Sequence, residues 1–192
     1  MIDPEIAAAR EILRAAGVPF VVVGGQAIAR RAATATRDID VMVATRDYAN
    51  ALVALHRVPG LAFDWDDGKL ARFRILALGG VPLDIINSGA FAGAHGEGEF
   101  FDFLLREAST EEDGVSYGTP EAVWYTRLLT KRWRSYAEKI VTNVIDGVTP
   151  DTLTGVEGIA ERFGTDGTLA ERIQLVRDEL ARPEVAALVR RR

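Results

Sequence analysis

The sequence contains no cysteine, and this absence excludes two kinds of site. Without thiols, the 192-residue chain can form neither a disulfide nor a thiolate metal centre. Histidine is scarce as well: His56 and His95 are the only two, which leaves little material for a histidine-based zinc site. A metal centre in this chain would therefore be built from carboxylates, the ligands that hard divalent cations prefer.

Long apolar runs are also missing. None approaches the roughly 18 residues that a membrane span needs, and residues 1–17 carry acids early, unlike a signal peptide. We therefore expect a cytoplasmic protein with no membrane partner. The net charge of −5 argues against a protein that coats nucleic acid, although a local basic patch remains compatible with it.

The pattern of apolar residues predicts an α/β core followed by helices. Apolar residues make up 48% of the chain and charged residues 27%, which is ordinary globular usage. Strands and helices alternate early, and helices dominate after Pro120, so we expect a core over 1–112 and a mostly helical subdomain over 113–192. The expected strands are 18–23, 38–43, 62–65, 70–78 and 81–86, with a short one at 115–117, and the expected early helices are 4–16, 26–33 and 45–57.

The stretch from Phe20 to Val43, FVVVGGQAIARRAATATRDIDVMV, carries the chemistry. A buried strand leads into Gly24 and Gly25 at the start of a helix, where backbone can approach a ligand and free N–H groups suit phosphate oxygens. Asp38 and Asp40 then lie at i and i+2 on a strand, so both point to one face. Taken singly, the glycines are commonly only a turn and the acids only a solvated strand end.

A third carboxylate favours a functional role for these residues. Asp84 lies in the apolar strand VPLDII, where a buried charge needs a partner. If that strand neighbours the first two, Asp38, Asp40 and Asp84 form a cluster that can hold one or two Mg²⁺ ions. Asp84 is also a candidate general base.

These motifs resemble the nucleotidyltransferase superfamily with the polymerase-β-like catalytic core, whose pattern is apolar-Gly-Gly/Ser, a spacer and Asp-x-Asp/Glu. The string TATRDID is similar to the bacterial AbiEii/MenT branch of toxin nucleotidyltransferases, over roughly residues 18–86. The resemblance implies a mixed-sheet α/β core that uses Mg²⁺ (or Mn²⁺) and a nucleoside triphosphate (NTP). It further implies that Asp38, Asp40 and Asp84 bind the metal, and that Gly24 and Gly25 cradle the triphosphate. Arg37 beside the acids is expected either to pair with them or to contact phosphate.

The C-terminal string GVSYGTPEAVWYTRLLTKRWRSYAEKIVTNVIDG is similar to the MenT-type segment that leads to a lysine-bearing helix. By this resemblance Lys131 binds the triphosphate, Asp146 enters the active site, and Arg132 and Arg134 are further nucleotide contacts. Arg127, Lys131 and Arg134 would share one face of a helix. A capping box, Ser135-x-x-Glu138, predicts a break near Ser135 that would bring Lys131 and Asp146 together.

The resemblance implies transfer of a nucleoside monophosphate, mainly a pyrimidine nucleotide, to the 3′ acceptor end of tRNA. The chain would be the toxin of a pair with a cognate antitoxin. One alternative is a nucleotidyltransferase that modifies a small molecule such as an aminoglycoside, or a protein side chain; the basic stretch 131–139 favours a polyanionic acceptor instead. Another is a catalytically silent binding module or an antitoxin, which the presence of all three acids disfavours.

Overall fold

The computed structural model describes residues 3–29, 38–91, 97–138, 148–163 and 167–189. In this part of the chain, α1 (Pro4–Ala15) precedes β1 (Phe20–Val23), α2 (Gly24–Ala29), β2 (Ile39–Val43) and α3 (Thr45–His56). There follow β3 (Leu61–Asp66), β4 (Leu70–Ile75), the 3₁₀ turn Leu76–Leu78, β5 (Val81–Asn87), the 3₁₀ turn Ser88–Phe91, α4 (Glu97–Arg106), β6 (Ser109–Glu112) and β7 (Val115–Gly118). The chain ends in α5 (Pro120–Leu129), α6 (Trp133–Glu138), α8 (Pro150–Phe163), α9 (Thr168–Ala181) and α10 (Pro183–Val189).

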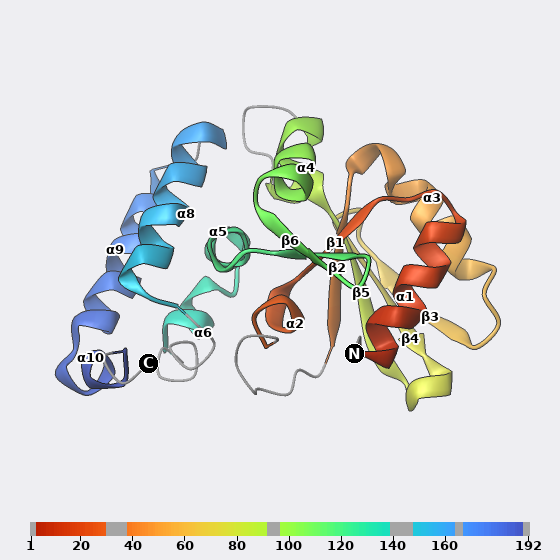
Figure 1. The fold of residues 1–192 in the computed structure, drawn as a ribbon, viewed down its shortest axis with the longest axis horizontal. Coiled ribbons are helices and arrows are strands. Elements are labelled where there is room, and N and C mark those ends of the chain that lie inside the picture. Colours follow the sequence, from red (N-terminus) through yellow and green to blue (C-terminus); the bar gives the residue numbers. More distant parts are fainter. Residues whose placement is uncertain (1–2, 30–37, 92–96, 139–147, 164–166, 190–192) are drawn as a thin grey trace.

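The strands form one mixed sheet in the order β3-β4-β5-β2-β1-β7-β6. β2 pairs with β5 and β1 with β7 in parallel, while the remaining neighbours are antiparallel. The sheet and the helices that follow confirm the expected class, an α/β core with a mixed sheet and a helical C-terminal part (Figure 1). The sheet continues to Gly118, and the division of the chain after residue 112 stays a prediction.

The two faces of the sheet are covered differently (Figure 1). α3 packs on β2, β3 and β5, and α1 packs on α3, so these helices cover one side, which we call the α3 face. On the other side, α2 contacts β1, β2 and α5, and α5 also contacts β7. We call this second side the open face.

The strands have the local features that the sequence predicts. β1 and β2 alternate little in polarity because both sides of the central sheet are covered, and Val21, Val22, Val41 and Val43 are fully buried. The helix at Pro4 begins after Asp3, whose carboxylate accepts a hydrogen bond from the Glu5 N–H at 3.2 Å, as an N-cap does. The α4 helix and the β6 strand are elements that the sequence pattern does not predict.

The helical part is joined to the sheet through α5. This helix contacts α2 and β7 on one side and α8, α9 and α6 on the other, and its Trp124 and Tyr125 are fully buried. The expected helix break is present, but its predicted position near Ser135 is wrong: α5 ends at Leu129, and Ser135 lies within α6. The break falls at Thr130, which adopts an extended backbone and whose hydroxyl donates to the Arg127 carbonyl at 2.8 Å. A threonine hydroxyl that binds a nearby carbonyl in this way competes with continuation of the helix.

No helix in the described parts of the chain is both long and apolar enough to cross a membrane.

Candidate active site

Three charged side chains lie in one row across the open face. Asp40 on β2 pairs with Asp84 on β5, and Asp84 pairs with Arg72 on β4. Residues directly opposite on neighbouring strands project to the same face, so the three side chains are adjacent. The expected meeting of Asp40 and Asp84 on neighbouring strands is therefore confirmed, and it follows from the parallel pairing of two apolar strands.

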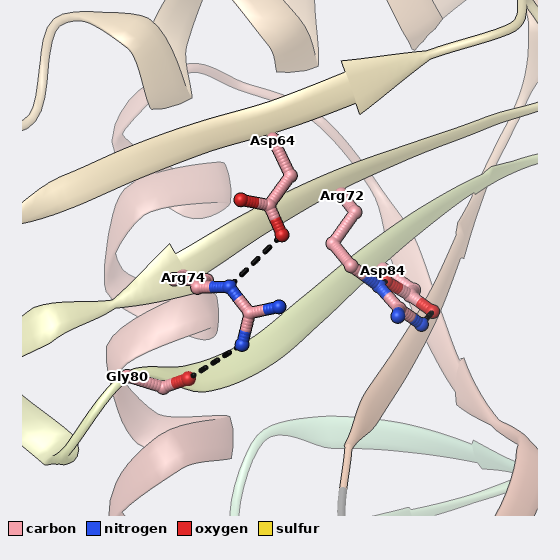
Figure 2. Close-up of polar contacts among 5 residues, drawn as sticks. All are labelled: Asp64, Arg72, Arg74, Gly80 and Asp84. Atoms are coloured by element: carbon pink, nitrogen blue, oxygen red, sulfur yellow. Dashed lines mark hydrogen bonds and ion pairs between the residues drawn. The ribbon is translucent and has the colours of Figure 1, made fainter.

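Arg72 holds Asp84 through both of its oxygens (Figure 2). The Arg72 Nε donates to Asp84 Oδ1 at 2.6 Å, and a second guanidinium nitrogen donates to Oδ2. The Asp84 side chain is only 4% exposed, so the guanidinium supplies the partner that a buried carboxylate needs. The hydrogen bonds to Asp84 also raise the pKa of Arg72, which keeps the guanidinium charged.

The carboxyl group of Asp40 lies against the backbone of Gly24. A Cβ built on Gly24 would overlap the Asp40 carboxylate, and Gly24 adopts a left-handed backbone with φ of +64°. Glycine is the residue that reaches this conformation at little cost, and here it also leaves the space that Asp40 occupies. Gly24 and Gly25 both lie at the start of α2, as the sequence predicts. Gly24 is thus required by the Asp40 carboxylate, apart from any contact with a phosphate.

Burial and neighbouring charges change the ionisation of Asp40. Burial, which is the largest cause, and the charges of Asp38 and Asp84 together raise the pKa of Asp40 from 3.8 to about 7. Arg127 and Arg72 act in the opposite direction and lower the pKa. Two other carboxylates and two guanidinium groups therefore act on Asp40, on the central strand of the sheet.

The cation that acts on Asp40 from the C-terminal part is Arg127 of α5. Arg127 lies in the last turn of that helix, and α5 packs against α2, which begins at Gly24. Lys131 and Arg132 lie beyond the end of α5, in the turn before α6, and both are exposed. Because the helix ends at Leu129, Arg127, Lys131 and Arg134 do not share the face of one continuous helix, and that expectation is wrong.

Arg172 of α9 organises this turn. Its guanidinium donates to the Leu128 carbonyl at 2.6 Å, near the end of α5, and lies 5.2 Å from the centre of the Trp133 ring. Arg134 lies 5.3 Å from the same ring. The turn at Lys131 is thus held by α9, and two arginines, Arg134 and Arg172, lie against the Trp133 ring.

Two of the predicted site residues, Arg37 and Asp146, lie outside the described residues. Asp38 is described; it precedes β2 and is partly buried. Within the described ranges, no group of three Asp, Glu, His or Cys side chains is arranged to hold a metal ion. Arg72 takes both oxygens of Asp84, so Asp38 and Asp40 are the acids most open to a divalent cation, and metal ligation by Asp84 stays a prediction.

Sequence reasoning did not identify Arg72. Its strand was predicted, but its partner depends on how β4 and β5 are paired. The glycine turn at Gly79-Gly80 was a usable indication, because a hairpin closed by Ile75 and Val81 puts Arg72 opposite Asp84. The sequence presents Arg127 only as one member of a basic face, and its effect on Asp40 depends on the packing of α5 against α2.

No protein-family model and no curated protein matches the chain. Among solved structures, the antibiotic-resistance factor ANT(2″)-Ia is 16% identical, with a TM-score of 0.47 over 99% of this chain and 92% of that one. A nucleotidyltransferase-like protein from Paracoccidioides brasiliensis is 14% identical, with a TM-score of 0.46 over 96% and 89%. A putative nucleotidyltransferase from H. pylori is 9% identical, with a TM-score of 0.41 over 99% and 97%. Likeness at this level assigns neither activity nor substrate to the chain, so the case for both rests on its own residues.

Proposed function

We propose that the chain is a metal-dependent nucleotidyltransferase that transfers a nucleoside monophosphate from an NTP to the 3′ end of tRNA. The observation that carries this proposal is the register of Asp40 and Asp84 on adjacent parallel strands, with Gly24 fitted against Asp40. Clustered carboxylates raise each other's pKa and are useful chiefly around a cation or a transferred proton. The pattern Gly-Gly and Asp-x-Asp, which resembles the polymerase-β-like superfamily, supports the same chemistry.

The electrostatics of Asp40 suit a bound divalent cation. The pKa of Asp40 lies near 7 because its charge is buried and faces two other acids, and a cation bound by Asp38 and Asp40 would relieve that repulsion. When bound, Mg²⁺ would neutralise the triphosphate and polarise the α-phosphoryl group. Asp84 would also bind the cation only if its oxygens could do so while they accept the hydrogen bonds from Arg72.

The chain's own residues would position the reactants. Gly24 and Gly25 leave the backbone accessible to the triphosphate, and Arg127, with Lys131, Arg132 and Arg134, would supply positive charge to its β- and γ-phosphates. The acceptor oxygen forms a bond to the α-phosphorus while the bond from that phosphorus to the bridging oxygen breaks. The hydroxyl proton passes to Asp84 or Asp146, and pyrophosphate leaves. Such transfer relies on position and charge rather than on a covalent intermediate.

Two finer parts of the proposal concern the biological partner. A tRNA acceptor is supported by the exposed cations Lys131, Arg132 and Arg134 that follow α5, and a toxin role with a cognate antitoxin by the AbiEii/MenT resemblance. The alternative acceptors are a small molecule such as an aminoglycoside, or a protein side chain. A silent binding module or antitoxin is the third possibility, and the intact row of acids disfavours it.

The test is incubation of the purified protein with Mg²⁺, total tRNA and each of the four α-³²P-labelled NTPs in turn. The proposal expects label on tRNA from the wild-type protein and none from Asp40→Ala, with one nucleotide preferred. Equal labelling by both proteins would contradict the assigned site. Failure with every NTP on tRNA, but labelling of a small molecule or a protein, would replace the acceptor and keep the reaction.

A further inference from the structure

Strand β3 contains a β-bulge that turns one aromatic side chain away from its neighbours. Phe63 pairs with Phe73, but the next paired residue, Trp65, lies opposite Arg72, so Asp64 is the extra residue. On a regular strand, residues 63 and 65 would point to the same face. A bulge re-aims the side chains that follow it.

The contacts on each side confirm this change of face. The Phe63 ring lies 4.7 Å from His56 of α3 and 5.3 Å from Phe73, on the α3 face. Asp64 instead binds Arg74 on the open face, with Oδ2 and Nε 2.9 Å apart (Figure 2). Trp65, opposite Arg72, therefore belongs to the open face together with the charged row.

Trp65 thus extends the row of the candidate active site to Trp65–Arg72–Asp84–Asp40, one residue from each of β3, β4, β5 and β2. Adjacent strands lie about 4.8 Å apart, which puts Trp65 about 10 Å from Asp84 along the row and about 14 Å from Asp40. Trp65 is 43% exposed. Single exposed aromatic residues are common, but this one is directed by a bulge away from the apolar cluster of Phe63 and onto the surface that leads to the acids.

The geometry of transfer indicates which reactant reaches this surface; this step rests on the proposed function. The triphosphate is placed beside Gly24, Gly25 and Arg127, on the β1 side of Asp40. In-line displacement requires the attacking and leaving oxygens to lie on opposite sides of the phosphorus. The acceptor must then approach over β5, β4 and β3, where Trp65 lies.

We propose that Trp65 is a positioning residue for the acceptor, on which a nucleobase at the 3′ end of a single-stranded RNA stacks. An indole ring offers a flat face to any base, so stacking gives affinity without sequence readout. Arg74 on the same face is already paired with Asp64, so we assign the affinity of this surface to stacking on Trp65. The distance of about 14 Å from Trp65 to Asp40 would let a nucleobase stack on Trp65 while the 3′-hydroxyl of the same strand lies near Asp40.

The experiment compares binding of two short oligoribonucleotides with free 3′-hydroxyls, one intact and one abasic at its last two positions. The variants are Trp65→Ala and Trp65→Phe, and the matched control is Phe63→Ala, which removes an equally exposed aromatic ring from the same strand but from the α3 face. Binding to every variant is followed by the fluorescence anisotropy of a dye on the 5′ end of the oligonucleotide, and in the proteins that keep Trp65 also by protection of tryptophan fluorescence from acrylamide. Trp124 is fully buried and Trp133 partly so, and Trp65 therefore dominates the quenching. Transfer kinetics give KM for the oligonucleotide and for the NTP separately.

We expect Trp65→Ala to bind the intact oligonucleotide about 10-fold more weakly, with the KM for NTP unchanged, and Trp65→Phe to restore most of the affinity. The wild-type protein should prefer the intact oligonucleotide to the abasic one by a similar factor, and Trp65→Ala should not distinguish them. Phe63→Ala should keep the full preference. A preference that survives in Trp65→Ala would overturn the proposal.

Binding of Mg²⁺·NTP, measured as a rise in thermal stability, separates this proposal from the proposed function. Failure of wild-type protein to bind either oligonucleotide while it binds Mg²⁺·NTP overturns the acceptor site alone. Saturable fluorescence protection by an aminoglycoside and none by RNA does the same, and indicates a small-molecule acceptor. Failure to bind Mg²⁺·NTP overturns the proposed function, and the role of Trp65 with it.

Discussion

Gly24 and Asp40 are in such close contact that residue 24 can carry no side chain. A Cβ at this position would overlap the Asp40 carboxylate, and the φ of +64° is itself unfavourable for any other residue. The glycine of a motif usually assigned to phosphate binding is thus required first by an acid of the site. Gly24 follows β1 directly, and β1 pairs with β2 so that Val23 lies opposite Asp40.

Substitution of Gly24 by Ala therefore tests the site and the fold together. We expect Gly24→Ala to lower the free energy of unfolding by at least about 1–2 kcal/mol, from the left-handed backbone alone, and to reduce transfer at least about 100-fold by displacing Asp40. Gly158→Ala in α8 is the control, because its surroundings are open and its φ is not positive. That change should stabilise the helix by about 0.5–1 kcal/mol. Urea denaturation and labelled transfer measure both effects, and full activity in Gly24→Ala would contradict the fit of Asp40.

The raised pKa of Asp40 predicts that Asp40→Asn stabilises the folded protein by an amount that depends on pH. The folded state binds the Asp40 proton more tightly than the unfolded state does. The contribution of this group to the free energy of unfolding is therefore fully present below about pH 4 and is lost as the pH rises through 7. At about 1.36 kcal/mol per pKa unit, the loss is at most about 4 kcal/mol. Asparagine keeps the shape without the charge, so Asp40→Asn should become more stable relative to wild type between pH 4 and 7 and hold that advantage at pH 8.

Urea denaturation at pH 5 and pH 8 measures this difference. Asp102→Asn, which removes an acid bound to Arg46 at the surface, is the control. Its effect should stay below about 1 kcal/mol at both pH values. A difference between Asp40→Asn and wild type that does not change with pH would show that Asp40 is ionised without cost.

Divalent cations should stabilise the protein most where Asp40 is ionised. A cation bound by Asp38 and Asp40 competes with the proton on Asp40, so Mg²⁺ should raise the melting temperature at pH 8 more than at pH 5.5. Asp40→Asn should lose most of this response. NaCl at matched ionic strength is the control, and an equal shift with either salt would indicate screening of surface charge rather than a site.

The Arg72–Asp84 pair should behave as a buried ion pair. Removal of one partner leaves the other charge without compensation, so Arg72→Ala should cost about 3–5 kcal/mol. The double variant Arg72→Ala/Asp84→Asn should regain much of that loss, which a double-mutant cycle measures. Arg182→Ala, from an exposed pair with Glu179 and Glu184, should cost less than about 1 kcal/mol. A similar cost for both arginines would contradict the account of Arg72.

The sequence predicts the acids of the site better than their partners. Asp40 and Asp84 stand out because each interrupts an apolar strand, and a local pattern is enough to notice them. Arg72 is different: its strand alternates in the ordinary way, and its role appears only when β4 is paired with β5.

The end of α5 shows the same limit. Apolar periodicity continues through Thr130 toward Ser135, but the helix ends at Leu129, where Arg172, 44 residues after Leu128, binds the Leu128 carbonyl. The bulge at Asp64 is likewise invisible in the alternation of β3, because a single extra residue changes the face of Trp65 without any change in composition. Long-range pairing, rather than local preference, decides all three features.

The most direct test of the central claim follows the two labels of one NTP. Wild-type protein is given an acceptor RNA with Mg²⁺ and the preferred NTP labelled with ³²P at either the α- or the γ-phosphate, beside Asp40→Asn and the surface control Asp102→Asn. The account predicts α-label on the RNA and γ-label only in pyrophosphate, with transfer retained in Asp102→Asn and reduced at least about 1000-fold in Asp40→Asn. Transfer of the γ-label, or transfer by Asp40→Asn at the wild-type rate, would contradict it.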